Sequence, residues 1–275
     1  MSKHPPHQSW EKGPADRQFV TALARGLSIL RCFNRPNVEL TVSEIARNVG
    51  LSQPTAWRLC YTLLESGFLV RAPSGGALRI GAPAITLGYA ATHGMDEAAV
   101  ARPYMQRVLD ETGGTTTLSL RQGPSMIAME QINGDFLVRS QPIGWRAPLD
   151  TVSSGLAVLA TLPHAARSAA VEQLTISDSK RMRICLEHIA EAEASLEQTG
   201  IVRLSHMLEG RLMALSVPLF ERGSAPGAQW TLTCTGLTSF WSDAAQDQAA
   251  RLLVEIRQLL TPAFAALPGR TGTAS

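Results

Sequence analysis

The segment from Leu40 to Ile80 limits the possible folds more than any other part of this chain. Thr41 and Glu44 have the spacing of a capping box, in which two residues satisfy each other's polar groups at a helix start. Apolar residues then recur at helical spacing until Gly50, a residue that enters a left-handed turn at no steric cost. We therefore predict a short helix that ends in a tight turn.

A second helix is predicted from Gln53 to Ser66. Ser52 suits its N-cap, Pro54 is tolerated in its first turn, and Gly67 ends it. On a wheel of roughly 100° per residue, one side of this helix is apolar and packs inward. The opposite side carries hydroxyl, aromatic and guanidinium groups, which suit base edges, thymine methyls and phosphates. These outward residues are Thr55, Trp57, Arg58, Tyr61 and Thr62.

Two short apolar runs around a Gly-rich tip follow and predict a β-hairpin, with Arg71 and Arg79 near its sides. Two helices with such a wing favour DNA binding, because the arrangement places one helix in the major groove. The alternative is an ordinary helical hairpin followed by a β-hairpin, with no role in DNA binding. An apolar period also precedes the segment and predicts a first helix that Asp16 caps and that packs into the core: Phe19, Leu23, Leu27, Leu30 and Phe33.

The charge distribution supports DNA binding. Residues 1–90 hold ten Lys or Arg and five Asp or Glu, a net charge of +5, whereas the whole chain carries +2. Residues 91–275 therefore carry −3. A basic N-terminal part followed by a slightly acidic remainder is typical of a protein whose N-terminal domain faces phosphates.

Beyond residue 90 the pattern is that of an α+β domain with an antiparallel sheet. A helix over about Asp96–Glu111 is predicted as a linker and as a place where two chains meet. Strands are predicted over about 115–121, 126–132, 137–141, 201–204, 212–220 and 229–236, and helices over about 154–162, 165–174, 180–199 and 243–267. The expected divisions are a flexible tail (1–18), a DNA-binding domain (19–90), a linker helix (91–112), a second domain (113–268) and a tail (269–275).

Other classes of protein find little support in the sequence. No apolar run is long enough to cross a membrane, no secretory core is present, and four separated cysteines suggest reduced thiols, so we expect a cytoplasmic protein. The histidines form no metal-like cluster, and no nucleophile elbow, P-loop or dinucleotide fingerprint is present. We therefore expect no cofactor, no metal and no catalytic residues. The alternatives are an enzyme that processes a small acid, with an accessory winged helix, and a winged helix that binds protein.

Three segments resemble the isocitrate-lyase-regulator (IclR) family of bacterial transcription factors, over most of the chain. They are Leu40–Leu69, then Arg79–Gly81 with Leu87 and Gly88, and finally Gly144–Leu149 leading to Gly155–Ala160. The resemblance implies an N-terminal winged helix-turn-helix domain and a C-terminal effector domain of GAF-like fold. It also implies a homodimer or tetramer on a double-stranded DNA operator, controlled by a small metabolite, often an organic or aromatic acid. On matching positions, Ser52, Gln53, Thr55, Trp57 and Arg58 fall at the DNA-facing end of the recognition helix.

The resemblance places the effector pocket at a loop and helix start and on the last two strands. The matching residues are Gly144, Trp145, Leu149, Asp150, Ser153, Ser154, Gly155, Leu156, Thr233 and Thr235. Free N–H groups at a helix start attract carboxylates, and Thr233 and Thr235 share one face of their strand. The alternative for these two threonines is a simple strand face. Asp150 stands where relatives often have a His, and Leu156 where they often have a basic residue, which argues against a strongly anionic effector there.

Overall fold

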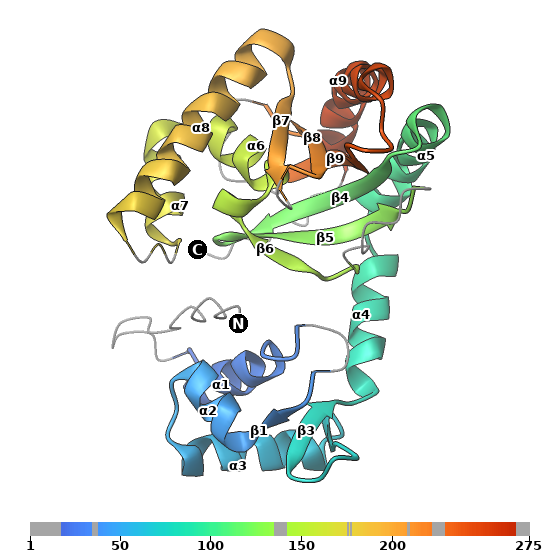
Figure 1. Cartoon of the computed structure of the whole chain (residues 1–275). Coiled ribbons are helices and arrows are strands. Elements are labelled where there is room, and N and C mark those ends of the chain that lie inside the picture. Colours follow the sequence, from blue (N-terminus) through green and yellow to red (C-terminus); the bar gives the residue numbers. More distant parts are fainter. Residues whose placement is uncertain are drawn as a thin grey trace. The chain divides into compact units, whose positions relative to one another are not determined.

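A computed structural model gives the structure of residues 18–34, 38–134, 142–174, 176, 178–207, 210–221 and 229–267. Two compact units make up the chain, residues 1–94 and residues 95–275 (Figure 1). Most of the expected N-terminal tail, the Asp16 cap, the strand expected at Leu137–Gln141 and the expected C-terminal tail lie outside the described residues. No helix in the described ranges combines the length and apolar character that a membrane span requires.

The N-terminal unit consists of four helices and a small sheet within its described residues. The helices are α1 (Thr21–Leu30), α2 (Val42–Val49), α3 (Gln53–Glu65) and α4 (Pro83–His93), and the strands are β1 (Leu40–Thr41), β2 (Leu69–Arg71) and β3 (Ala77–Ile80). Strand β3 lies between β1 and β2 and pairs antiparallel with both. The predicted helix–turn–helix and hairpin are confirmed. Strand β1 was not predicted, and α4 was not predicted except for residues 91–93, which fall in the expected linker helix (91–112).

Local sequence sets the ends of α2 and α3. The Thr41 N–H donates to Glu44 Oε2 at 2.8 Å and the Thr41 hydroxyl accepts from the Glu44 N–H at 3.3 Å, so the capping box is confirmed. Gly50 ends α2 in the left-handed region, with φ of 68°. Ser52 occupies the N-cap position of α3, but its hydroxyl lies 2.9 Å from Thr55 Oγ1 and caps no backbone N–H.

The core of the N-terminal unit joins the three first helices to the sheet through Ile29, Ile45, Cys60, Leu69 and Leu78. The prediction that Leu23 and Leu27 pack into this core is wrong, because they are 63% and 49% exposed. Ile29, which is fully buried, fixes the inward side of α1. It lies roughly 200° around the helix from Leu27, so Leu27 and the neighbouring Leu23 point outward.

The C-terminal unit is an antiparallel sheet with helices on both faces. Its strands are β4 (Thr115–Gln122), β5 (Ser125–Ile132), β6 (Arg146–Pro148), β7 (Val202–Met207), β8 (Leu212–Pro218) and β9 (Trp230–Leu237), in the order β6-β5-β4-β9-β8-β7. Its helices are α5 (Asp96–Thr112), α6 (Ser153–Thr161), α7 (His164–Glu172), α8 (Ser179–Thr199) and α9 (Asp243–Ala266), and a 3-10 turn at Leu149–Thr151 precedes α6. The predicted antiparallel α+β arrangement is confirmed, and the short strand β6 was not predicted.

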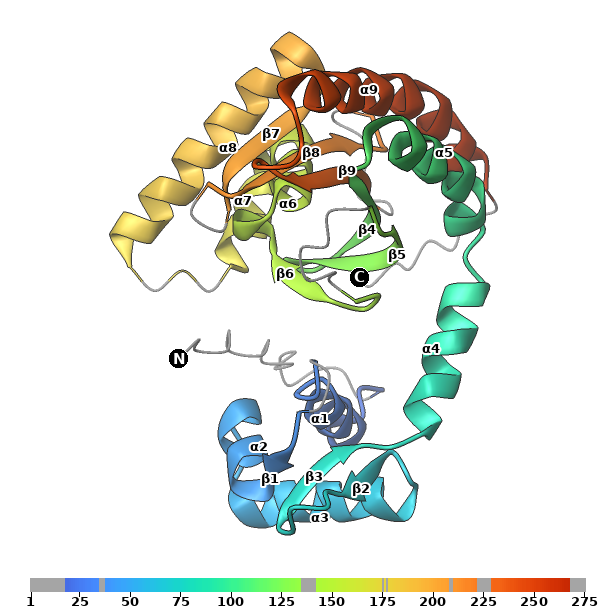
Figure 2. The ribbon, with the colours of Figure 1, turned by 45° about the vertical axis from the view of Figure 1, so that its right-hand side comes forward.

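The two faces of this sheet differ in character. Helices α5 and α9 lie side by side over one face, and α6 lies over the other (Figure 2). Side chains alternate along each strand, so Leu118, Leu232 and Cys234 pack with α5 and α9 in an apolar core. The neighbouring Thr117 and Thr233 point to the α6 face. The polar candidates for a binding site therefore lie beneath α6.

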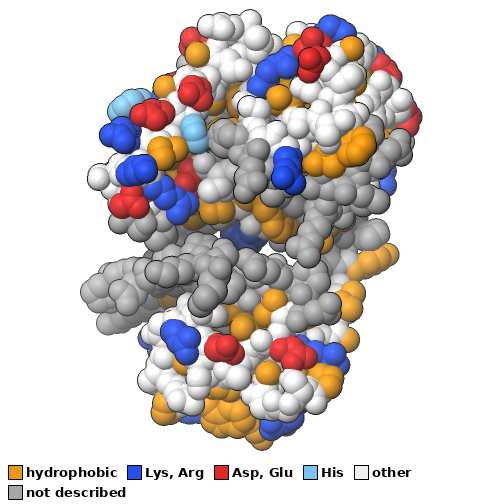
Figure 3. All heavy atoms as spheres, in the orientation of Figure 1, with side chains coloured by type: hydrophobic (Ala, Val, Ile, Leu, Met, Phe, Trp, Pro, Cys, Tyr) orange, Lys and Arg blue, Asp and Glu red, His pale blue; other side chains and the backbone are white. Residues whose placement is uncertain are grey.

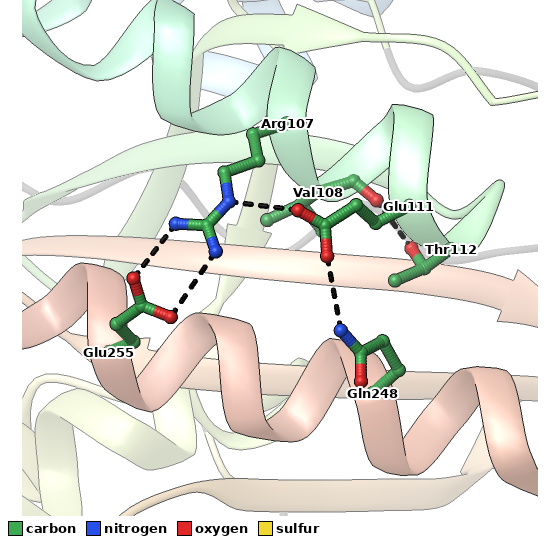
Figure 4. Close-up of polar contacts among 6 residues, drawn as sticks. All are labelled: Arg107, Val108, Glu111, Thr112, Gln248 and Glu255. Atoms are coloured by element: carbon green, nitrogen blue, oxygen red, sulfur yellow. Dashed lines mark hydrogen bonds and ion pairs between the residues drawn. The ribbon is translucent and has the colours of Figure 1, made fainter.

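Polar contacts on the surface join α5 to α9. Arg107 of α5 donates to Glu255 Oε1 and to Glu111 Oε1, both at 2.8 Å, and Gln248 of α9 donates to Glu111 Oε2 at 3.0 Å (Figure 4). These groups are partly solvated, and exposed ion pairs contribute little to stability. They fix the register of the two helices more than they stabilise the unit.

Buried contacts hold α5 against the sheet more firmly. The Trp241 indole N–H donates to the Thr112 carbonyl at 3.0 Å, and the Thr116 hydroxyl donates to the Met105 carbonyl at 3.2 Å. Gly236 leaves room for the Trp241 ring, since a Cβ there would lie 2.6 Å from it. The helix expected near residues 91–112 is thus bonded into the C-terminal unit.

Candidate nucleic-acid interface and effector site

The outward side of α3 is exposed as the helical wheel predicts. Trp57 and Tyr61 are 42% and 52% exposed, and their ring centroids lie 6.4 Å apart with the planes tilted by 48°. The other outward groups are exposed or, for Thr55, half-buried: Ser52, Gln53, Thr55, Arg58 and Thr62. On the inward side, Ala56 and Cys60 are fully buried. The helix therefore presents an aromatic pair and a guanidinium to solvent.

Contacts with α2 position the start of α3. The Gln53 side-chain amide donates to Ser43 Oγ at 3.1 Å, which ties the first residue of α3 to the first turn of α2. The Ser52 side chain makes no cap hydrogen bond to α3, so the N–H groups of the first turn keep their capacity to bind an acceptor. The positive end of the helix dipole makes that acceptor favourable as an anion, such as a phosphate.

The wing brings two more cations into the N-terminal unit. Arg71 and Arg79 are exposed and lie on the paired strands β2 and β3. Gly75 and Gly76 form the tip with φ of 74° and 75°, values that residues with a side chain rarely adopt. Figure 3 shows hydrophobic side chains flanked by Lys and Arg at the lower end of this unit, where α3 lies in Figure 1.

In the C-terminal unit, three hydroxyls form a buried chain between α6 and the sheet. The Ser216 hydroxyl of β8 lies 2.8 Å from Ser153 Oγ at the start of α6 and 2.7 Å from Thr233 Oγ1 on β9. Ser153 and Thr233 were predicted for the site, and the structure brings them together through Ser216. Ser216 was not predicted for the site; its signal in the sequence is a single hydroxyl in an otherwise apolar strand.

The polar row continues across the sheet. Thr233 is in register with Thr117 of β4, and Thr117 is in register with Gln131 of β5, whose amide donates to the Thr117 hydroxyl at 3.0 Å. Thr235 follows on the same face, next to Thr115, and is half-buried. The Thr231 hydroxyl, fully buried on this face, has no hydrogen-bond partner among the described residues. Neutral hydrogen-bonding groups therefore cross four strands beneath α6.

The remaining predicted residues shape this region through their backbone or through packing. A Cβ on Gly155 would lie 2.2 Å from the Leu149 carbonyl oxygen, so glycine lets α6 approach the 3-10 turn. Leu149 and Leu156 are buried in the apolar core, against which Trp145 packs. Gly144 stands in a turn with φ of 86°. Ser154 is 8% exposed, one residue beyond Ser153.

Asp150 has a partner of its own. Its side chain is only 6% exposed, and its Oδ2 lies 3.4 Å from Arg181 Nη2 on α8. This ion pair offsets the negative charge close to the start of α6. The pair connects the 3-10 turn to α8, so it also fixes the approach of α6.

Two family models match the chain in sequence order. The IclR helix-turn-helix domain matches residues 22–73, and the bacterial transcriptional regulator IclR C-terminal domain matches residues 89–251, more than half of the chain. This chain belongs to the IclR family. The family's members are DNA-binding transcriptional regulators and not enzymes, so the enzyme alternative is wrong for this IclR-family protein.

Curated relatives agree with the family assignment. The HTH-type transcriptional regulator XynR of Escherichia coli strain K12 is 26% identical to the IclR-family chain over 228 residues, which cover 82% of this chain and 90% of XynR. The HTH-type transcriptional repressor AllR of Klebsiella pneumoniae is 30% identical over 154 residues, or 56% of this chain and 57% of AllR. The chain thus spans about half the length of the AllR repressors that it matches.

Solved structures confirm the fold of this IclR-family protein. An IclR-family transcriptional regulator from Brucella abortus superimposes with a TM-score of 0.81 and 27% identity, over 94% of this chain and 97% of that one. An IclR homolog from Microbacterium hydrocarbonoxydans, complexed with 4-hydroxybenzoate, has a TM-score of 0.65 and 21% identity, over 90% and 100% of the two chains. The second likeness concerns the fold alone.

Proposed function

We propose that this IclR-family protein is a sequence-specific regulator whose helix α3 binds operator DNA in the major groove, in the bacterial cytoplasm. The observation that carries the proposal is the outward side of α3, which exposes Trp57, Arg58 and Tyr61 in its first nine residues. Recognition helices contact base edges with their N-terminal residues, and a major groove about 12 Å wide admits one helix.

The exposed polar groups contact different parts of the DNA. Arg58 and Gln53 have side chains that bind guanine and adenine edges through paired hydrogen bonds. Ser52, Thr55 and Thr62 have hydroxyls that suit phosphates or base edges. Arg71 and Arg79 on the wing contact the sugar-phosphate backbone and set the register of the protein on the duplex.

The C-terminal unit binds a small organic or aromatic acid in this proposal. The start of α6, with Ser153 and Ser154, offers N–H groups and the positive end of a helix dipole to a carboxylate. Thr117, Thr235 and Gln131 add partly exposed neutral donors, and the apolar residues around them suit a carbon skeleton. The ion pair of Asp150 with Arg181 reduces the repulsion that a carboxylate would otherwise meet. A fold relative complexed with 4-hydroxybenzoate supports this class of ligand.

Two copies of the chain act together in this proposal. One face of α1 exposes Leu23 and Leu27, next to the exposed N-cap residue Val20, and α4 exposes Ile85, Leu87 and Tyr89. Exposed apolar stripes of this kind mark interaction surfaces. A second copy is the occupant that matches the function, because paired winged helices read the two half-sites of a palindromic operator. The ligand then acts by changing the spacing of the paired recognition helices.

The decisive experiment measures operator affinity by gel shift after an operator has been selected from random duplexes with the full-length protein. Arg58→Ala should weaken binding by about 1–3 kcal/mol if Arg58 contacts a base. Arg183→Ala on α8, which also removes an exposed cation, is the matched control and should bind as the parent does. Unchanged affinity in Arg58→Ala contradicts the assignment of α3 as the recognition helix.

The ligand proposal has its own test. A thermal-shift screen with small carboxylic and aromatic acids, 4-hydroxybenzoate among them, should find compounds that raise the unfolding temperature and alter operator affinity. Thr235→Val, which removes a half-buried hydroxyl from the polar row, should reduce the shift. An acid that stabilises the parent and Thr235→Val equally would exclude this strand face as its site.

A further inference from the structure

The aromatic pair on α3 is a feature that hydrogen bonding to bases or phosphates leaves unexplained. Pro54, Trp57 and Tyr61 follow one another at helical spacing and are all exposed. Trp57 and Tyr61 support each other, with ring centroids 6.4 Å apart. We define these three residues as the apolar tile of α3. Water is a poor solvent for such a surface, so the tile is stabilised when a partner covers it.

The charges around the tile indicate what that partner is. Arg58 lies on the same helix face, and Arg71 and Arg79 are exposed on the wing of the same unit. Glu65 is the exposed acid on α3, a full two turns beyond Trp57, at the far end of the helix. An apolar strip with Arg58 beside it, two more cations on the wing and its nearest acid at the far end of the helix complements a surface that is apolar at its centre and negative at its edges. The major groove at an A·T pair has this character, because it places the thymine methyl between two phosphate backbones.

We infer that the tile reads thymine methyl groups, so that A·T pairs at two positions of each half-site are recognised by apolar contact. Thymine presents the only apolar group among the four base edges in the major groove. Trp57 and Tyr61 are four residues apart, or about 6 Å along the helix axis. Base pairs are stacked about 3.4 Å apart. The two rings therefore span about two base-pair steps, and the two thymines they contact are separated by one or two steps.

The inference rests on the proposed function and names the chemistry that the operator must supply. Aromatic side chains suit this task, because they offer large contact areas while few rotatable bonds become fixed. The Trp57–Tyr61 contact reduces that cost further by holding both rings before DNA arrives. Arg58 reads a different part of the half-site through hydrogen bonds, so the two contributions are separable by mutation.

The test uses the full-length protein and a duplex selected from a random library. Each thymine of a half-site is replaced in turn by deoxyuridine, which removes the methyl and keeps every hydrogen-bonding group. Fluorescence anisotropy should show a loss of affinity of about fourfold at each of two positions, the effect of about one buried methyl group. At those positions 5-methylcytosine paired with guanine should bind more tightly than cytosine, because it restores the methyl.

Protein variants assign the effect to the tile. Trp57→Ala should bind thymine and deoxyuridine duplexes equally at one position, and Tyr61→Ala at the other, whereas Trp57→Phe should retain part of the discrimination. Arg58→Ala is the matched control on the same helix, and it should bind more weakly while keeping the full penalty for deoxyuridine. The side chains of Trp57, Arg58 and Tyr61 are exposed, so their variants should unfold at the same temperature as the parent protein.

Three results would overturn the inference without contradicting DNA binding, and a fourth would contradict both. Deoxyuridine duplexes that bind as tightly as thymine duplexes would show that methyl groups are not read, while the proposed function would stand. A penalty that persists in Trp57→Ala and Tyr61→Ala would place methyl recognition elsewhere. If Trp57→Ala changes the sedimentation mass without DNA, the tile is an interface between proteins. A library that yields no duplex with salt-dependent binding would instead contradict the proposed function, and the inference with it.

Discussion

A buried hydroxyl that loses its hydrogen-bond partner costs stability, and Ser216 is a partner of two buried hydroxyls. Ser216→Ala should leave the hydroxyls of Ser153 and Thr233 short of a partner in a buried place and lower the free energy of unfolding by about 1–3 kcal/mol. Urea unfolding followed by circular dichroism measures the change. The double variant Ser216→Ala with Thr233→Val should lose less than the sum of the single changes, since it also removes an orphaned group. If the two losses simply add, the hydroxyls of Ser216 and Thr233 do not depend on each other.

Some residues of the site could not be predicted from the sequence. Ser153 and Thr233 were accessible from the pattern and the family resemblance, but Ser216 becomes visible only when the register of β8 and β9 sets it opposite Thr233. The same holds for Gly155. A glycine is required there because a Cβ would lie 2.2 Å from the Leu149 carbonyl oxygen. Such contacts depend on how separate elements meet, and spacing along one chain does not encode them. The site is therefore less predictable than the helices that carry it.

At the scale of elements, the capping box of α2 makes a prediction about pH. Hydrogen bonds from the Thr41 backbone N–H and from its side chain lower the pKa of Glu44. The unfolded chain lacks these bonds, so the ionised carboxylate stabilises the fold above its ordinary pKa of about 4.3, and this stabilisation is lost as pH falls through the lowered folded value. Glu44→Gln should therefore be less stable than the parent at pH 7, with a difference that shrinks by pH 3. Urea unfolding at both pH values checks it, and an equal difference at both would exclude the carboxylate as the cause.

Elements with strong local signals were predictable, and those without them were not. Helix α3 was predicted to within one residue, because Ser52, Pro54 and Gly67 mark its ends and its two sides differ in composition. Strands β1 and β6 hold only two and three residues, too few for alternation to appear. Helix α4 has apolar residues all round and Gly88 within it, so no amphipathic period reveals it. The inward side of α1 was misassigned because two apolar sides compete and only the packing of Ile29 decides between them.

For the whole molecule, binding to DNA should depend on salt even though the net charge is only +2. The cations that matter are those gathered on the N-terminal unit, and each phosphate contact contributes about 0.9 to the slope of log affinity against log salt. Arg79→Ala on the wing should weaken binding to all duplexes alike and reduce the slope by about one. Anisotropy titrations from low to moderate salt measure it. An unchanged slope would remove the wing from the phosphate contacts.

The association of two chains is the prediction with the widest consequence. Leu23 and Leu27 of α1 lie on the same side as its N-cap residue Val20, and all three are close to half exposed or more. Leu23→Glu should keep the unit folded, since the side chain lies outside the core, and should give a monomer in sedimentation. Thr21→Glu is the matched control, because it adds the same charge at an exposed position roughly 160° around α1. The monomer should also bind a palindromic operator more weakly, with its affinity for a single half-site retained, because the second contact no longer benefits from a high effective concentration. A dimer that survives Leu23→Glu would exclude this face of α1 as the interface, and the apolar side chains of α4 would then carry the association.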